Sequence, residues 1–306
     1  MRRVLVTGAS GFIGRHCLKP LLDRGFEVHG ASRGCRPPEV PAHVEWHSID
    51  LLEAGTASRL LNDLKPTHLL HLAWYAIPGK YWTAPENLDW VRAGIELVRA
   101  FAESGGKRIV IAGSCAEYDW SHGILCEEST PLKPSTLYGT CKNALREVVE
   151  KFAPVSGLSW AWGRIFNLYG PWEDPRRLVP SVALSLLRGG RARCTEGEQV
   201  RDYLFVDDVA EALTCVLDSK AQGAVNIGSG EGIKIRSLVE RLAGIIGSLD
   251  RVDFGVLPTP GNEPSTIVAE TSRLRAEAEW VRRWSLDRGL EQSVRWWRER
   301  LPVGDL

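Results

Sequence analysis

The sequence predicts an α/β fold: a doubly wound parallel sheet with helices on both faces, and a smaller C-terminal lobe that interleaves with it. In the first half of the chain, short apolar runs alternate with longer segments whose apolar residues recur every three or four positions. The short runs are almost continuously apolar, which is typical of strands buried in a parallel sheet. The length of 306 residues indicates either one large domain or two closely joined ones.

The expected elements follow one another in strand–helix order. The apolar runs that predict strands are Val4–Val6, Val28–Ala31, His68–Leu72 and Ile109–Ala112. The segments with helical spacing are Leu18–Leu22, Ala57–Leu64, Val91–Ala102 and Ala144–Phe152. After Tyr169-Gly170-Pro171 prolines interrupt this rhythm, so we expect residues 168–201 and 227–306 to form the smaller lobe. Tyr203–Val206 and Asp207–Leu217 are typical of one more strand and helix, which should return about residues 202–226 to the large lobe of residues 1–167.

The composition argues against several classes of protein. The 38 basic and 38 acidic residues leave no net charge, which speaks against a protein that coats nucleic acid or binds an anionic membrane. The seven cysteines are odd in number and form no CxxC pair, so we expect no disulfide framework and no metal site. No signal peptide fits the start of the chain, and no run reaches the roughly 18 apolar residues of a membrane span. We therefore expect a cytoplasmic protein.

A glycine-rich turn, Thr7-Gly8-Ala9-Ser10-Gly11-Phe12-Ile13-Gly14, directly follows the first expected strand and opens a helix. Glycines three residues apart let the backbone turn sharply and approach a pyrophosphate, which the free N–H groups of a helix N-terminus attract. This position between a strand and a helix favours a Rossmann-type dinucleotide site over a turn that serves packing alone. We expect the large lobe to bind a dinucleotide through Gly8, Ser10, Gly11, Phe12, Ile13 and Gly14.

The end of the second expected strand bears on the choice of cofactor. Enzymes that bind NAD usually place an acid there to bond the ribose hydroxyls, but this chain has Ser32 and Arg33. A hydroxyl and a guanidinium suit a 2′-phosphate, so we expect NADP(H) to be preferred, with NAD(H) as the alternative. A solvated loop arginine is the competing interpretation. Asp50 and Leu51 are candidate adenine contacts, although Asp50 fits a helix cap nearly as well.

Three further residues are typical of acid–base chemistry. Tyr138 and Lys142 are four residues apart and hence share one face of a helix. A positive charge near a phenol lowers its pKa, so Lys142 should make Tyr138 usable as a proton donor near neutrality. Lys142 could also bond the nicotinamide ribose. Ser114 ends the strand that contains Ile109–Ala112, where its hydroxyl could hold a substrate oxygen.

Together these motifs resemble the extended short-chain dehydrogenases, the NAD(P)-dependent epimerase/dehydratase family, over nearly the whole chain. The matching segments are the Thr7–Gly14 turn, His71-Leu72-Ala73, Ser114 with Tyr118, Tyr138-x-x-x-Lys142, the run from Arg164 to Pro171, and the run from Gln199 to Ala210. The resemblance implies a nucleotide-sugar substrate and the catalytic triad Ser114, Tyr138 and Lys142. It also implies that Leu72 and Ala73 line the cofactor, that Asn167 and Arg201 bind the nucleotide diphosphate, and that Val179 lies in the segment closing over the nucleotide. For Arg201 the competing interpretation is a local ion pair with Asp202.

The chain departs from the family pattern at two places. Cys115 and Ala116 stand where the related dehydratases carry an acidic pair, so dehydration is not expected. Thr259 and Asn262 stand in a loop that often supplies a diphosphate-binding arginine and an acid, which puts diphosphate binding by that loop in doubt.

The sequence leaves three functions open. The first is a reductase that converts a 4-keto-6-deoxy nucleotide-sugar to the 4-hydroxy sugar with NADPH. It is favoured by Ser32-Arg33 and by the likeness of residues 195–206 to sugar ketoreductases such as CDP-abequose synthases. The second is an NAD-dependent 4-epimerase, and the third is a cofactor-sensing regulator without chemistry, which the presence of Tyr138 and Lys142 disfavours.

Two further expectations concern surfaces. The loop residues Trp74, Tyr75, Tyr81 and Trp82 either wall a pocket for a partly apolar sugar or cover the lobe junction. The resemblance also implies a homodimer through the helices around Asn87–Ala102 and Ala144–Phe152, both of which carry apolar stripes.

Overall fold

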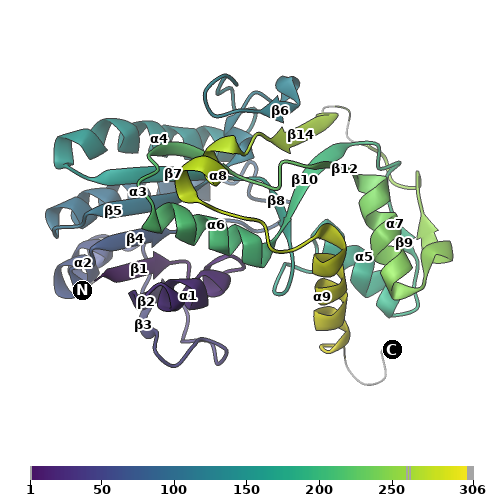
Figure 1. Cartoon of the computed structure of the whole chain (residues 1–306), viewed down its shortest axis with the longest axis horizontal. Helices are drawn as coiled ribbons and strands as arrows, with labels where there is room; N and C mark the ends of the chain where they lie inside the picture. The colour runs from purple at the N-terminus through teal and green to yellow at the C-terminus, as the bar shows by residue number, and fades with distance from the viewer. Residues whose placement is uncertain (1, 260, 262, 302–306) are drawn as a thin grey trace.

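The computed structural model describes residues 2–259, 261 and 263–301. Its main body is a seven-stranded, wholly parallel sheet in the order β11-β7-β5-β4-β1-β2-β3, seen in Figure 1 to the left of the second lobe. The strands are β1 (Arg3–Thr7), β2 (Glu27–Ser32), β3 (Glu45–Ser48), β4 (His68–His71), β5 (Arg108–Ser114), β7 (Ser159–Ile165) and β11 (Gly223–Ile227). The predicted doubly wound parallel sheet is confirmed.

Helices cover both faces of this sheet. On one face α1 (Gly14–Asp23) packs on α6 (Val206–Asp218), and α6 packs on α8 (Ser272–Ala278). On the other face α2 (Thr56–Leu64), α3 (Glu86–Glu103) and α4 (Leu137–Ser156) pack side by side. Each face has its own apolar core, one around Val4, Val6 and Leu213 and the other around Leu5, Leu97 and Leu145. The alternating residues of β1 thus enter opposite cores, as expected for a strand covered on both faces.

The second lobe is built on a smaller, mixed sheet. Its strands are β6 (Ile124–Leu125), β8 (Asn167–Tyr169), β10 (Val200–Phe205), β12 (Gly232–Lys234) and β14 (Thr266–Ala269). Its helices α5 (Leu178–Leu187), α7 (Ile235–Ile246) and α9 (Leu286–Arg298) share a third core that also contains Tyr169 and Phe205. A two-stranded sheet of β9 (Ala192–Arg193) and β13 (Val252–Asp253) lies beside them. Short 3₁₀ helices are η1 (Cys115–Glu117), η2 (Trp120–His122) and η3 (Leu249–Arg251).

The predicted lobe boundaries differ from the structure in two places. Residues 202–205 belong to β10, which pairs with β8, β12 and β14 in the second sheet rather than returning to the large one. Conversely, α8 falls in the stretch assigned to the smaller lobe but packs on α6 and β11 of the large lobe. An apolar run predicts a strand without indicating which sheet it joins, so the sequence could not decide either point.

No helix within the described residues is long and apolar enough to cross a membrane.

Candidate active site

The glycine turn lies at the carboxyl edge of the large sheet, between β1 and α1. Gly8 has φ +70°, and a Cβ at this position would lie 2.8 Å from the Ala73 backbone nitrogen. A Cβ on Gly14 would lie 2.2 Å from the Gly8 carbonyl oxygen. Side chains at these positions would therefore force the turn open. The helix N-terminus that follows is a cradle suited to a dinucleotide pyrophosphate.

The end of β4 is held against this turn by a buried hydrogen bond. The Thr7 hydroxyl lies 2.6 Å from His71 Nδ1, and the Leu72 N–H donates to the Thr7 carbonyl at 3.1 Å. Burial lowers the pKa of His71 to about 3, so its imidazole is neutral. The family resemblance implied that Leu72 and Ala73 line the cofactor, and the structure places both residues beside Gly8. Thr7 and His71 belong to the same matching segments, but the sequence assigned them no role, and their hydrogen bond holds Leu72 and Ala73 there.

Ser32 is the last residue of β2, and Arg33 follows it on the surface. Among the described residues no carboxylate pairs with the Arg33 guanidinium, whose backbone carbonyl accepts a hydrogen bond from Ser48 Oγ at 3.4 Å. Asp50 accepts a hydrogen bond from the Leu52 N–H at 2.9 Å, so its carboxylate caps the turn after β3. Leu51, beside it, is buried. Asp50 therefore does not cap a helix, because α2 begins after Gly55 without a side-chain cap, and its role as an adenine contact stays a prediction.

Ser114 and Tyr138 meet where β5 and α4 face each other. Ser114 is the last residue of β5 and Tyr138 the second residue of α4, whose N-cap Thr136 accepts from the Gly139 N–H at 3.1 Å. Burial raises the pKa of Tyr138, while a hydrogen bond with Ser114 acts to lower it. The sequence predicted that Lys142 would lower the pKa of Tyr138, but the pKa is raised instead. Desolvation of the phenolate outweighs the other influences.

Lys142 is buried one helical turn after Tyr138. Its Nζ donates to the Ala112 carbonyl at 2.8 Å and lies 3.8 Å from the centre of the Trp74 ring, but 5.9 Å from that of the Tyr138 ring. Burial lowers the pKa of Lys142 to about 7, and the charge of Glu117 opposes this shift. Lys142 therefore changes charge near neutrality, within the range useful for proton transfer.

The aromatic loop after β4 surrounds Tyr138. The ring centres of Trp74, Tyr81 and Trp82 lie 6.5, 4.9 and 5.8 Å from that of Tyr138, all in edge-to-face geometry. The Tyr138 N–H also donates to the Trp82 carbonyl at 3.1 Å. The loop thus lies beside Tyr138, and through the contact of Tyr81 with Arg177 it also lies against the second lobe, so both interpretations of the loop stay open.

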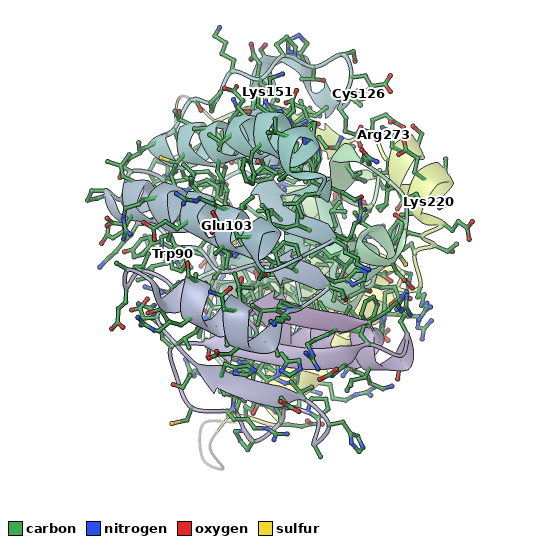
Figure 2. The ribbon with its side chains drawn as sticks, turned by 90° about the vertical axis from the view of Figure 1, so that its left-hand side faces the viewer. Trp90, Glu103, Cys126, Lys151, Lys220 and Arg273 are labelled. Carbon is green, nitrogen blue, oxygen red and sulfur yellow. The ribbon has the colours of Figure 1, made fainter. Side chains whose placement is uncertain are left out.

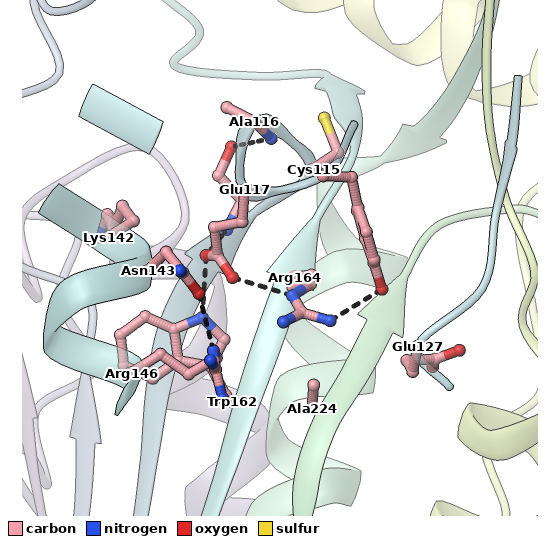
Figure 3. Close-up of polar contacts among 12 residues, drawn as sticks. Cys115, Ala116, Glu117, Glu127, Lys142, Asn143, Arg146, Trp162, Arg164 and Ala224 are labelled. Atoms are coloured by element: carbon pink, nitrogen blue, oxygen red, sulfur yellow. Dashed lines mark hydrogen bonds and ion pairs between the residues drawn. The ribbon is translucent and has the colours of Figure 1, made fainter. Parts of the chain in front are cut away.

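Glu117 and Arg164 form a buried ion pair at the end of β5 (Figure 3). Glu117 Oε1 accepts from the Ser114 N–H and from Trp162 Nε1, each at 2.8 Å, and Oε2 accepts from Arg164 Nε at 2.8 Å. Arg164 Nη1 donates in turn to the Tyr118 hydroxyl at 2.9 Å, which donates to Asn226 Oδ1 at 2.8 Å. Glu117 is completely buried. Sequence reasoning missed Glu117, and the only available signal was an acid inside an otherwise apolar turn.

Positions 115 and 116, just before Glu117, carry a cysteine and an alanine rather than an acidic pair. Ala116 is 1% exposed, and burial raises the pKa of the Cys115 thiol to about 12. Neither side chain can transfer protons near neutrality.

The second lobe brings polar groups toward the same edge. Arg201 Nη2 pairs with Glu263 Oε1 at 2.9 Å, while the buried carboxylate of Asp202 accepts hydrogen bonds from the backbone of Ser229 and Gly230. The alternative Arg201–Asp202 pair is therefore replaced by a pair with Glu263. The charge of Arg201 nevertheless acts on Cys115, next to Ser114. Asn262, which the sequence analysis named as a departure from the family pattern, lies outside the residues that the structure describes.

The other predicted substrate residues lie on the same lobe. Asn167, the first residue of β8, donates to the Asp202 carbonyl at 3.3 Å. Val179 is 1% exposed in the first turn of α5. The sequence did not identify Arg177, whose guanidinium lies 5.3 Å from the ring centre of Tyr81 and so links this lobe to the aromatic loop.

Comparison with known proteins decides the family. The profile of the NAD dependent epimerase/dehydratase family matches residues 4–228. The chain belongs to this family. The likeness that the motifs indicated is confirmed, and the protein is an enzyme with NAD-dependent oxidoreductase chemistry. A regulator without chemistry is therefore not supported.

The relatives and structural neighbours of this chain include nucleotide-sugar 4-epimerases, a CDP-abequose synthase and an NAD dependent NDP-hexosamine 5,6-dehydratase. The chain is 27% identical to UDP-glucose 4-epimerase of Azospirillum brasilense, covering 95% of this chain and 94% of the relative. It is 25% identical to CDP-abequose synthase of Salmonella typhimurium, covering 95% and 97%. The structure of Thermus thermophilus UDP-glucose 4-epimerase in complex with NAD superposes with a TM-score of 0.85 at 28% identity, covering 98% of this chain and 100% of that one.

Proposed function

We propose that this enzyme is an NADP(H)-dependent nucleotide-sugar oxidoreductase that reduces the ketone of a 4-keto-6-deoxy nucleotide-sugar. The observation that carries the proposal is the pair Ser32 and Arg33 at the end of β2. The pair presents a hydroxyl and a guanidinium free of any described carboxylate partner where an NAD enzyme would present an acid. Similarity to CDP-abequose synthase over nearly its whole length supports the same assignment.

The residues around the glycine turn fit a dinucleotide. Gly8 and Gly14 keep the cradle free of side chains, Leu72 and Ala73 form its wall, and Arg33 would hold the 2′-phosphate. Ser10, Gly11, Phe12 and Ile13 complete the turn, and Ser32, Asp50 and Leu51 would contact the adenosine. When bound, the nicotinamide supplies the hydride for the reduction.

The chain's own groups supply the proton. Tyr138 would donate its hydroxyl proton to the carbonyl oxygen of the sugar, with Ser114 holding that oxygen within reach. Lys142, charged below about pH 7, would bond the nicotinamide ribose. The aromatic wall of Trp74, Tyr81 and Trp82 keeps water away and suits a deoxygenated sugar.

The nucleotide would be held by the second lobe. Asn167 and Arg201 offer an amide and a guanidinium to the diphosphate, and Val179 lies in the helix that would close over the nucleotide. Because Arg201 pairs with Glu263, the diphosphate would compete with this carboxylate for the guanidinium.

Cofactor binding to Arg33→Ala tests the proposal. Loss of a charge-assisted contact worth about 1.5–3 kcal/mol should weaken NADPH binding roughly 10- to 100-fold and leave NADH binding nearly unchanged. Arg188→Ala removes an exposed arginine from the second lobe and serves as the matched control. Affinities of the unmodified protein that favour NADH over NADPH would overturn the cofactor assignment.

An NAD-dependent 4-epimerase is the second candidate. It is supported by the similarity to several UDP-glucose 4-epimerases and by the Thermus thermophilus complex with NAD. Such an enzyme returns the hydride to the sugar and consumes no cofactor. Interconversion of UDP-glucose and UDP-galactose by the purified protein without added cofactor would establish it, whereas stoichiometric NADPH consumption with a 4-keto sugar would establish the reductase.

We also propose that the enzyme is a homodimer. Helices α3 and α4 lie side by side on one face of the large lobe in Figure 2, where Glu103 and Lys151 mark them. Both carry exposed apolar side chains, Leu88 and Ile95 on α3 and Val148 and Val155 on α4. Two such helix pairs could pack together as a four-helix interface.

A further inference from the structure

Three side chains with metal-binding atoms meet on the last two strands of the large sheet. His29 lies on β2, and Glu45 and His47 lie on β3. His29 Nδ1 is 3.0 Å from His47 Nε2 and 3.5 Å from Glu45 Oε2, and the three ligand atoms all lie within 4.8 Å of one another. Ligands of a tetrahedral ion with bonds of about 2.0–2.1 Å are about 3.3 Å apart, so this spacing suits a single ion.

Backbone pairing produces this arrangement. Glu45 and His47 are two residues apart on β3 and therefore project from the same face of the sheet. The parallel register places His29 opposite Glu45 on the adjacent strand, about 4.8 Å away. Each ligand is thus positioned by strand pairing rather than by a mobile loop.

A fourth residue orients His29. Glu27, two residues earlier on β2, has Oε1 at 3.1 Å from His29 Nε2, and the same carboxylate pairs with Arg3 Nε at 2.9 Å. With Nε2–H donating to Glu27, Nδ1 presents its lone pair toward Glu45 and His47. A carboxylate behind the distal nitrogen is the usual outer partner of a metal-binding histidine.

The cluster is closed on one side and open on the other. The His29 side chain is 2% exposed, whereas that of Glu45 is 68% exposed. An ion could therefore enter from solvent and keep a water molecule as its fourth ligand.

We propose that His29, Glu45 and His47 bind one divalent transition-metal ion of the zinc class. Two imidazoles and one carboxylate form a donor set that suits Zn²⁺ and Co²⁺. The ion would tie edge strand β3 to β2 and so brace the connection that carries Arg33. The expectation of no metal site rested on the cysteines and did not consider these residues. The proposal is independent of the reaction that the enzyme catalyses.

Metal titration of the full chain tests this site. After removal of metal with a chelator, calorimetry with Zn²⁺ should give one tight site per chain, and Co²⁺ should give the visible absorption of a four-coordinate ion. His47→Ala should abolish this site, and Glu27→Gln should weaken it about 10- to 100-fold by releasing His29. His43→Ala is the matched control, because His43 is exposed, lies four residues from His47 and is outside the cluster.

Thermal unfolding supplies a second measurement. Zn²⁺ should raise the melting temperature of the unmodified protein and of His43→Ala, but not that of His47→Ala, because an ion that binds the folded state stabilises it. Absence of stoichiometric binding, or equal binding by His47→Ala, would overturn the proposal and leave Glu27, His29 and His47 as a hydrogen-bonded chain only.

Discussion

The surroundings of Tyr138 disfavour its phenolate and hold its hydroxyl in a fixed position. Burial raises its pKa, so the hydroxyl keeps its proton at neutral pH and is available as a donor. The edge-to-face rings of Trp74, Tyr81 and Trp82 fix its orientation, and Ser114 lies within hydrogen-bonding reach. A reduction needs a proton donor at the carbonyl oxygen, and a protonated phenol held in place meets that need.

Tyr138→Phe is therefore expected to reduce turnover by about 10²–10⁴-fold, the usual contribution of one general acid. The ring stays in its aromatic surroundings, so the unfolding midpoint and NADPH affinity should be nearly unchanged. Steady-state kinetics and cofactor titration measure the two effects separately. Trp82→Phe changes the wall without removing a proton donor and serves as the control. Retention of most activity by Tyr138→Phe would remove Tyr138 from its assigned role.

The buried carboxylate of Glu117 connects three parts of the site through its hydrogen bonds. Its two oxygens accept from the Ser114 backbone, from Trp162 and from Arg164, so it fixes both the end of β5 and the Arg164 charge. Glu117→Gln would turn an amide N–H₂ or an uncharged oxygen toward the guanidinium. We expect it to lower the free energy of unfolding by about 3–5 kcal/mol, the cost of an uncompensated buried charge.

The double variant Glu117→Gln/Arg164→Met separates charge from packing. Removing the guanidinium as well should recover part of the stability lost in Glu117→Gln, because no unpaired charge remains. Urea unfolding of the two single variants and the double variant gives the coupling energy. Strict additivity of the two single effects would show that the ion pair itself contributes nothing to stability.

At the scale of elements, the loop from β8 to α5 carries a buried acid. Glu173 is 6% exposed, and burial raises its pKa to about 8, although the charge of Arg177 acts in the opposite direction. Between about pH 4.5 and pH 8 the folded chain therefore holds a proton that the unfolded chain has lost. Stability contributed by this group is present below about pH 4.5 and is lost as the pH rises toward 8.

Glu173→Gln should remove this pH dependence. Relative to the variant, the unmodified protein should lose up to about 1.4 kcal/mol of unfolding free energy per pH unit across that window. Asp174→Asn is the control, because Arg176 lowers the pKa of Asp174 to about 2 and the group stays ionised throughout. Parallel stability curves for the unmodified protein and Glu173→Gln from pH 5 to 8 would show that Glu173 does not titrate there.

The sequence predicted individual helices, strands and local motifs, but it did not predict the contacts between residues far apart in the chain. The glycine turn, Ser114 at the end of β5 and Tyr138 with Lys142 on α4 are local patterns, and the structure places each where its pattern requires. The ion pair of Arg201 with Glu263 and that of Arg164 with Glu117 join residues far apart in the chain. Neither spacing nor periodicity contains that information. For the same reason the pattern identified β10 as a strand but not the sheet to which it belongs.

At the scale of the whole molecule, the α3–α4 face is one of the surfaces that carry exposed apolar side chains. Leu88 is 59% exposed and Val155 86% exposed, although both lie on helices packed on the large sheet. Leu88 and Ile95 are seven residues apart on α3, as are Val148 and Val155 on α4, so each pair lies on one helix face. In the proposed dimer a second copy of the chain would cover these side chains.

Light scattering should accordingly show a dimer at micromolar concentration. Leu88→Asp and Val148→Asp would bury a carboxylate at the centre of such an interface and should each give a monomer with an unchanged circular dichroism spectrum, since neither side chain contributes to the core. Val281→Asp places the same charge on an exposed valine of the segment before α9, which is outside the α3–α4 face, and should remain dimeric. A monomeric unmodified protein would contradict the dimer. A dimer that survives both helix substitutions would place the interface elsewhere, because two buried aspartates facing their symmetry mates repel each other across a contact of this kind.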